Sequence, residues 1–270
     1  MIPDGFASGG KEYDIVSICE MSDCKTHSIS LTGLRLLGSM DFMGFGYMAG
    51  TFNETTAESV TLDNVETAPL LSGSHSHFFN AKSLKTVTVI DSVVGPGLFT
   101  GCASMVSASV KGGDVSDSMF SGEGLTFVGC KNLSELNLTD VERIGSSAFK
   151  GCRSLTSVDL SGVRIVGDMA FAGTGISELV VPSSVEEMSF SNGDGTTYFD
   201  TMDVRFVDNP YFSSEGGLVY STRDGARTIL AATKEFSTPD LVLEDVRVGE
   251  GVFRKNADYE IGRASCRERV

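Results

Sequence analysis

Apolar side chains recur along this chain in a unit of 21 or 22 residues that contains one phenylalanine. In one copy Ile144 precedes Phe149, Gly151-Cys152 follows, and apolar and polar residues then alternate up to Leu160. The same order surrounds Phe99, and Phe171 begins a further copy. A repeat of this length predicts a solenoid, because one coil cannot bury its apolar face alone and becomes stable when neighbours stack on it.

Each copy contains a short segment that alternates as a half-buried strand does. In Leu136-Asn137-Leu138 we expect both leucines to face the interior and Asn137 to face outward. The predicted fold is a strand-dominated α/β solenoid, with short parallel strands stacked on one face and short helical or irregular turns on the other. Stacked phenylalanine rings would lie behind the strands. The expected ring positions are Phe78, Phe99, Phe120, Phe149 and Phe171.

Two parts of the array depart from the regular unit. Val115 to Phe120 fits the motif, but Gly129-Cys130 follows a second phenylalanine, Phe127, so this copy is predicted to carry a seven-residue insert. Nearer the N-terminus the pattern is looser. Divergent copies are indicated by the strand-like pairs Ile29/Leu31 and Val60/Leu62, and by Leu37 to Phe42, which matches the phenylalanine motif.

The segments Ile144-Gly-Ser-Ser-Ala-Phe-Lys-Gly-Cys-Arg-Ser-Leu155 and Phe171-Ala-Gly-Thr-Gly-Ile-Ser-Glu-Leu-Val-Val-Pro182 resemble BspA-type (Treponema pallidum-type) leucine-rich repeats. The resemblance covers roughly residues 37–260 and implies a leucine-rich-repeat solenoid. Val141 and Val163 stand where ordinary leucine-rich repeats place a buried Asn or Cys. For function, the resemblance implies a cell-surface or secreted protein that adheres to host proteins or to other cells.

Domain organisation follows from where the repeat is regular. Leu218–Tyr220 and Thr228–Leu230 are apolar arms around Asp224-Gly225, a pair suited to a β-hairpin turn. The last ten residues resemble a translated sequencing adapter, so the coding sequence is expected to continue. We predict divergent N-terminal repeats over 1–77, regular repeats over 78–190, a spacer with this hairpin over 191–240, the start of a truncated repeat over 241–260 and an artefactual tail over 261–270.

Charge and hydropathy narrow the classes of partner. The net charge of −15 argues against nucleic acid, because phosphate binding depends on clustered Lys and Arg. No apolar run of membrane-spanning length is present, and the N-terminus lacks the pattern of a signal peptide, so we expect no membrane insertion in this fragment.

Three cysteines occupy one repeat position and are expected to be buried as small apolar side chains, because other copies place Ala81 and Thr174 there. Two alternatives stay open elsewhere: Cys19 and Cys24 are either paired or free, and His75 and His77 either are solvated or bind a metal, with solvation favoured. No nucleophile-elbow, P-loop or zincin motif is present, so we predict no catalytic residue, cofactor or metal. The three cysteines are Cys102, Cys130 and Cys152.

The outward strand positions form the candidate ligand-binding face, because a solenoid presents them as one continuous surface. They are small and mostly polar, which suits a protein or glycan on a host or neighbouring cell. The expected positions are Thr61, Thr88, Ser109, Asn137, Asp159 and Val180, of which Thr88, Ser109, Asn137 and Asp159 are the candidate site.

We therefore predict a non-enzymatic protein-binding or adhesion module of a larger surface protein. The alternatives are an inert spacer, or an accessory repeat region of a surface enzyme such as a polysaccharide-degrading hydrolase or lyase. An enzyme should gather Asp, Lys or Arg from neighbouring coils at one repeat position. In residues 78–190 no such set is apparent.

Overall fold

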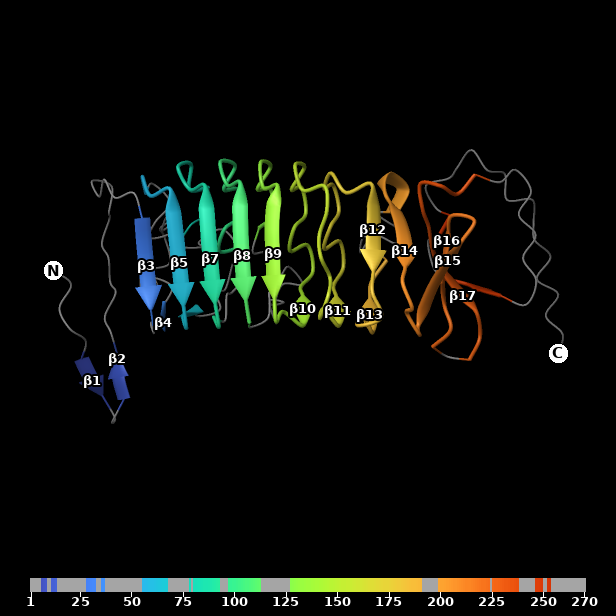
Figure 1. Ribbon diagram of the computed structural model, residues 1–270, viewed down its shortest axis with the longest axis horizontal. Helices are drawn as coiled ribbons and strands as arrows, with labels where there is room; N and C mark the ends of the chain where they lie inside the picture. The colour runs from blue at the N-terminus through green and yellow to red at the C-terminus, as the bar shows by residue number, and fades with distance from the viewer. Residues whose placement is uncertain are drawn as a thin grey trace, which may run out of the picture. The chain divides into compact units, whose positions relative to one another are not determined.

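The computed structural model describes a chain built of strands and turns (Figure 1). Within the described part, the helical element is a single 3-10 turn, η1 (Phe199–Thr201). The chain divides into two compact units: unit 1 is Met1–Ile176 with Ser184–Ser189, and unit 2 is Ser177–Ser183 with Phe190–Val270. The described residues are 6–8, 11–13, 28–32, 35–36, 55–67, 78, 80–92, 97–112, 127–190, 199–223, 225–237, 246–249 and 252–253.

Unit 1 is a parallel-strand solenoid, as predicted. Its main sheet has the order β3-β5-β7-β8-β9, and neighbouring strands belong to successive coils. Inward residues stack in register, so that Val60 is paired with Val87, Val87 with Ala108, and Ala108 with Leu136. Apolar residues stack from coil to coil because alternation points every second side chain inward. The strands are β3 (Ser28–Thr32), β5 (Ser59–Asp63), β7 (Thr86–Ile90), β8 (Ser107–Lys111) and β9 (Glu135–Thr139).

Shorter strands form additional sheets in unit 1. The parallel set β10-β11-β13 places Ile144, Val166 and Met188 in register, and all three are buried. A second side of the coil is therefore also held by backbone pairing. The strands are β10 (Arg143–Ile144), β11 (Ile165–Val166) and β13 (Glu187–Met188), the parallel pair β4 (Arg35–Leu36) and β6 (Glu66–Thr67), and the antiparallel pair β1 (Phe6–Ser8) and β2 (Lys11–Tyr13).

The predicted aromatic ladder is present, with one correction. Phe127, not Phe120, occupies the ladder between Phe99 and Phe149. The extra residues of this copy therefore precede Phe127, which keeps the ring next to its own Gly129-Cys130 turn. The consecutive ring centroids are 5.4 Å apart for Phe78–Phe99, 5.5 Å for Phe99–Phe127, 5.4 Å for Phe127–Phe149 and 5.7 Å for Phe149–Phe171.

The three repeat cysteines are free and buried, as predicted. Each thiol also donates a hydrogen bond to the carbonyl oxygen of a phenylalanine one coil earlier, at Sγ–O distances of 3.0 Å for Cys102 to Phe78, 3.1 Å for Cys130 to Phe99 and 3.2 Å for Cys152 to Phe127. The side chains therefore act as weak donors as well as small apolar groups.

One predicted strand is absent. Residues 156–160, which follow the Cys152 turn, do not form a strand, and the main sheet ends at β9. Asp159 Oδ1 instead accepts hydrogen bonds from the backbone N–H and the hydroxyl of Ser161, at 2.9 and 2.6 Å. Such local bonds offer the backbone an alternative to the sheet ladder. Leu136 and Leu138 of β9 are correspondingly only half-buried.

Unit 2 contains the predicted hairpin, in which β16 (Leu218–Ser221) and β17 (Thr228–Ala232) pair antiparallel. A further strand, β15 (Phe212–Glu215), precedes it through the Gly216-Gly217 turn and was not predicted. β18 (Arg247–Val248) pairs with β17 in parallel, and Phe236 packs against Phe253 at 5.6 Å. Unit 2 also holds the parallel pair β12 (Glu178–Val181) and β14 (Asp203–Phe206).

Several predictions fall on residues outside the described part of the chain. They concern Phe42, Cys19 and Cys24, His75 and His77, Phe120, and residues 261–270.

Candidate functional site

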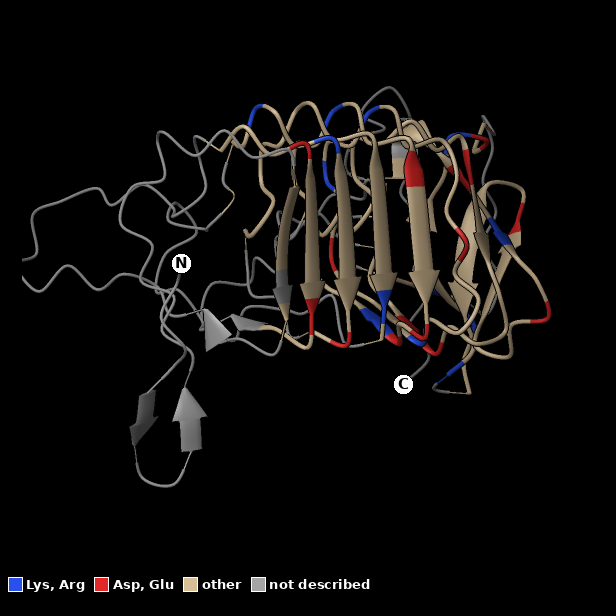
Figure 2. Ribbon diagram, turned by 60° about the vertical axis from the view of Figure 1, so that its left-hand side comes forward, with Lys and Arg blue, Asp and Glu red and all other residues tan. Residues whose placement is uncertain are grey.

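The outward residues of the main sheet align into rows across the strands. Thr61 is paired with Thr88, Thr88 with Ser109, and Ser109 with Asn137, so β5, β7, β8 and β9 present one continuous line of side chains. A parallel row at the start of the strands contains Ser59, Thr86, Ser107 and Glu135. We call these two rows the strand face. Figure 2 shows that charged residues lie mainly at the strand ends and leave the strand centres uncharged.

Six of the eight side chains of the strand face carry a short hydroxyl group, and the other two, Asn137 and Glu135 of β9, carry an amide and a carboxylate. Ser and Thr hydroxyls both donate and accept hydrogen bonds, and neighbouring strands in a sheet lie about 4.8 Å apart. Thr88 and Ser109 are half-buried, whereas Asn137 is exposed. The face can therefore contact a broad partner through many weak polar bonds, because short side chains leave the pleated surface accessible.

Two of the expected outward residues do not join these rows. Asp159 is exposed but lies outside any strand, and its bonds from Ser161 lower the pKa of its carboxyl group. Val180 belongs to β12 in unit 2, where it is paired with Arg205. The structure therefore pairs Thr88 with Ser109 and Ser109 with Asn137, whereas Asp159, whose side chain stabilises a turn, is not part of a paired strand.

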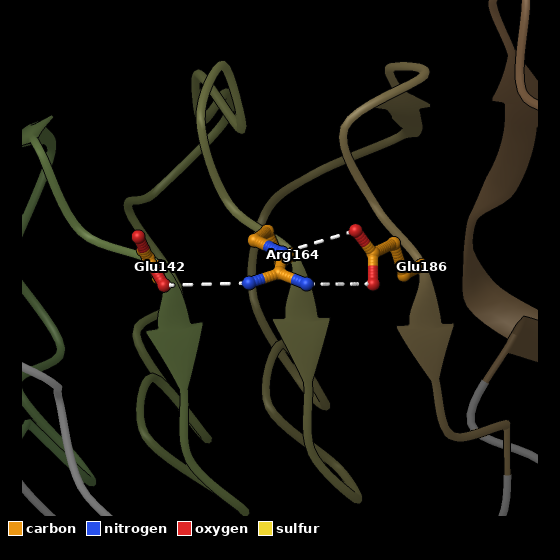
Figure 3. Close-up of polar contacts among 3 residues, drawn as sticks. All are labelled: Glu142, Arg164 and Glu186. Atoms are coloured by element: carbon orange, nitrogen blue, oxygen red, sulfur yellow. Dashed lines mark hydrogen bonds and ion pairs between the residues drawn. The ribbon is translucent and has the colours of Figure 1, made fainter.

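A row of charged residues, missed in the sequence, crosses three coils beside β10, β11 and β13. Figure 3 shows Arg164 between Glu142 and Glu186. Its guanidinium donates two hydrogen bonds to Glu186, at 3.0 and 2.9 Å, and lies 3.7 Å from Glu142. The three residues share one repeat position, with successive members 22 residues apart. The sequence analysis compared only Asp, Lys and Arg at matching repeat positions, so it missed this set of one arginine and two glutamates, which the 22-residue interval could have identified.

This charged row pairs opposite charges on the outside of three coils, whose register at these residues is set by backbone hydrogen bonds from the Arg164 N–H to the Glu142 carbonyl and from the Glu186 N–H to the Arg164 carbonyl, both 2.8 Å. The hydrogen bonds from Arg164 to Glu186, followed by the charge of Glu186, raise the pKa of the Arg164 guanidinium. The guanidinium keeps its charge, and the two carboxylates compensate it, as in a structural ion pair. Similar pairs join Glu58 to Lys85 at 3.0 Å in unit 1 and Glu178 to Arg205 at 3.3 Å in unit 2.

The residues that the structure describes give little support for a catalytic nucleophile or a metal site. Burial raises the pKa of the Cys152 thiol to about 12, so the reactive thiolate is scarce at neutral pH. The pKa of Cys130 is also raised, first by its hydrogen bond with Cys102 and then by burial. Among the described residues, no group of three or more His, Cys, Asp or Glu side chains is placed to hold a metal ion. The same residues include no helix long and apolar enough to cross a membrane.

Comparison with known proteins identifies the repeat. Residues 74–197 match, in six copies, the family model described as a BspA type leucine rich repeat region. A similar solved structure is that of a leucine rich cell surface protein from Faecalibacterium prausnitzii A2-165, with 15% sequence identity and a TM-score of 0.42. The similarity covers 90% of this chain and 65% of that protein, so this chain spans less than two thirds of its length. No curated protein sequence matches this chain.

Proposed function

From the premise that residues 74–197 of this chain are a BspA-type leucine-rich repeat region, we propose that it is a non-enzymatic binding module of a cell-surface or secreted protein. Its partner would be a protein or a glycan on a host or neighbouring cell. Repeat solenoids use their extended regular surfaces for binding, because stacked coils repeat one surface position many times.

The observation that carries this proposal is the row Thr61–Thr88–Ser109–Asn137, which runs in register over four strands. Its side chains are short and uncharged, so a broad partner can approach the sheet without desolvating charged groups. The row is continuous across coils, which suits an extended partner surface. Buried thiols with raised pKa values and a charge-paired Arg164 fit a binding module better than an enzyme.

A cell-binding experiment tests the proposal. The labelled full-length chain would be added to cultured epithelial cells and to bacterial cells, and bound label measured by flow cytometry. In the test variant, Thr88→Arg and Asn137→Arg place bulky charges on two strands of the face. A control variant, Thr201→Arg with Thr222→Arg, adds the same charge at exposed positions of unit 2.

We expect the test variant to lose at least tenfold in apparent affinity while the control binds like the unmodified chain. Protease treatment of the cells should abolish binding to a protein partner, and glycosidase treatment should abolish binding to a glycan. Equal binding by all three chains would contradict a role for the strand face. Absence of binding to either cell type would argue against adhesion to these cells.

A further inference from the structure

A second surface of unit 1 carries exposed cations that form no ion pair with a described carboxylate. It consists of the turns that lead into β7, β8, β9 and the segment 156–160, namely residues 80–83, 101–104, 129–132 and 150–154, which we call the turn rim. Its cations are Lys82, Lys131, Lys150 and Arg153, and all four are exposed. Figure 2 shows Lys and Arg on turns at the upper ends of the strands.

Backbone hydrogen bonds place three of these cations on adjacent coils. The Gly129 N–H donates to the carbonyl oxygen of Lys150 at 2.8 Å, and the Ser154 N–H donates to the carbonyl oxygen of Lys131 at 3.1 Å. Lys131, Lys150 and Arg153 therefore lie on adjacent coils, whose strands are about 4.8 Å apart. Lys82 occupies the position of Lys131 two coils earlier, with Ala103 between them. Lys82, Lys131 and Arg153 thus share one repeat position, which corrects the expectation that residues 78–190 contain no such set of Lys or Arg.

Charge is distributed unevenly between the two ends of the strands. Asp63, Asp91 and Asp140 lie at or just beyond the C-terminal ends of β5, β7 and β9, away from the turn rim. Near the rim, Glu58 is paired with Lys85, Glu135 begins β9, and Asp168 is next to Met169, whose Sδ accepts a hydrogen bond from the Lys150 ammonium at 3.6 Å. At the opposite strand ends, Lys111 of β8 stands among the aspartates. A chain with a net charge of −15 thus presents a local cationic line. Such a line attracts anions at short range, because salt screens the distant acidic groups.

In each coil of the rim, a residue with a hydroxyl or amide side chain directly follows the position held by Lys82, Ala103, Lys131 or Arg153. None of the described rim residues is aromatic. Sugar hydroxyls pair with such groups, whereas single-stranded nucleic acids are held largely by stacking of bases on aromatic rings. We propose that the turn rim binds an acidic polysaccharide, an extended polymer with carboxylate or sulfate groups on its sugars, laid across successive coils. The accompanying residues are Ser83, Ser104, Asn132 and Ser154.

This proposal goes beyond the proposed function, because it concerns a different face and a charged ligand. The test measures binding of the full chain to polygalacturonate by isothermal titration calorimetry at 50 and 200 mM NaCl, with neutral dextran and single-stranded DNA as comparison probes. The rim variant is Lys131→Gln with Arg153→Gln. The matched control, Lys111→Gln with Lys234→Gln, removes the same charge at exposed positions outside the rim.

Polygalacturonate should bind at 50 mM NaCl and bind more weakly at 200 mM, because the contacts are electrostatic. The rim variant should weaken binding on the order of tenfold and reduce the salt dependence, whereas the control should stay within threefold of the unmodified chain. The proposal would be overturned if polygalacturonate did not bind at 50 mM NaCl, if the rim variant and the control lost equal affinity, or if dextran bound as tightly as polygalacturonate. Tighter binding of single-stranded DNA than of polygalacturonate would also overturn it, in favour of nucleic acid. The Arg variant of the strand face should not lose polygalacturonate binding, which separates failure of this proposal from failure of the adhesion proposal.

Discussion

At the scale of single residues, the interior of unit 1 is a repeated pair made of a phenylalanine and a small side chain. The phenylalanine ring packs against the rings of the neighbouring coils. Where the next coil has a cysteine, the backbone carbonyl oxygen of the phenylalanine accepts a hydrogen bond from its thiol. Aromatic rings contribute large buried areas, whereas the thiol fills a narrow turn and satisfies a carbonyl group. The two positions therefore differ in how strongly a substitution should affect stability.

Replacement of a central ring should be costly. Phe149 is fully buried between Phe127 and Phe171, so Phe149→Ala should lower the free energy of unfolding by about 3–5 kcal/mol through the cavity it leaves. Denaturant unfolding followed by circular dichroism would measure this change. Val106→Ala, at a residue that is 41% exposed, should change it by less than about 0.5 kcal/mol. Equal stability of the two variants would mean that the ring column does not hold the coils together.

The buried thiols should resist alkylation while the chain is folded. Burial raises the pKa of Cys152, and a hydrogen bond with Cys102 followed by burial raises the pKa of Cys130, so little thiolate is present at pH 8. After brief iodoacetamide treatment, peptide mapping by mass spectrometry should find Cys102, Cys130 and Cys152 unmodified in native protein and modified in guanidinium chloride. Rapid labelling of all three in native protein would contradict their burial.

At the scale of elements, the end of the main sheet at β9 has a local cause. Asp159 accepts two hydrogen bonds from Ser161, and residues 156–160 form no ladder with β9. The lowered pKa of Asp159 gives the sign of its pH dependence. The turn is stabilised fully above the ordinary carboxyl value, near 3.8, and loses this contribution as the pH falls through the lowered pKa. At neutral pH the turn therefore competes with the strand.

Asp159→Thr should shift this competition toward the sheet. Threonine removes the carboxylate acceptor and favours extended backbone, so residues 157–160 should pair with β9. Amide hydrogen exchange at neutral pH should slow in this segment by roughly tenfold or more. Asp63→Thr, a control at the end of β5 without a positive φ, should leave exchange in residues 157–160 unchanged. Unaltered exchange in the Asp159 variant would show that something other than the turn keeps the segment out of the sheet.

Sequence periodicity predicted those features that depend on the spacing of buried residues. The apolar alternation identified the strands β5, β7, β8 and β9, and the Phe99, Phe149 and Phe171 positions identified the ring column. In the copy with two phenylalanines, Phe120 matched the spacing from the branched residue Val115 and Phe127 matched the following Gly129-Cys130 turn, and the structure places Phe127 in the ring column. The prediction of a strand at Asp159 was wrong because the hydrogen bond that forms the turn there leaves the apolar pattern of the sequence unchanged.

The candidate site was predictable to a smaller extent. Alternation placed Thr88, Ser109 and Asn137 on one face, because each is flanked by inward apolar residues. The Glu142–Arg164–Glu186 row was missed because the comparison at the repeat interval covered Asp, Lys and Arg but not Glu. The partner of the strand face could not be predicted, because the chemistry of a partner's surface produces no periodic pattern in the sequence of this chain.

At the scale of the whole molecule, each compact unit has its own core. Unit 1 is held by the ring column and the in-register sheets, whereas the meander of unit 2 is organised around a separate cluster. In solenoids each coil interacts mainly with its neighbours, so the loss of stability caused by a substitution is expected to stay local. The cluster comprises Leu218, Tyr220, Ile229, Ala232, Phe236 and Val252, with Val246 and Phe253 packed against it.

Gly217→Ala should test this independence. Gly217 has a φ of +76°, and a Cβ there would lie 2.3 Å from the backbone nitrogen of Phe236, so alanine adds both strain and overlap. The control Gly225→Ala has a similar φ of +71° but open space around the Cβ, so it adds only the backbone strain, about 1–2 kcal/mol. Gly217→Ala should therefore increase amide exchange in β15, β16 and β17 more than the control does, while exchange in β5, β7, β8 and β9 stays unchanged. Simultaneous loss of protection in both sets of strands would mean that the chain unfolds as one cooperative body.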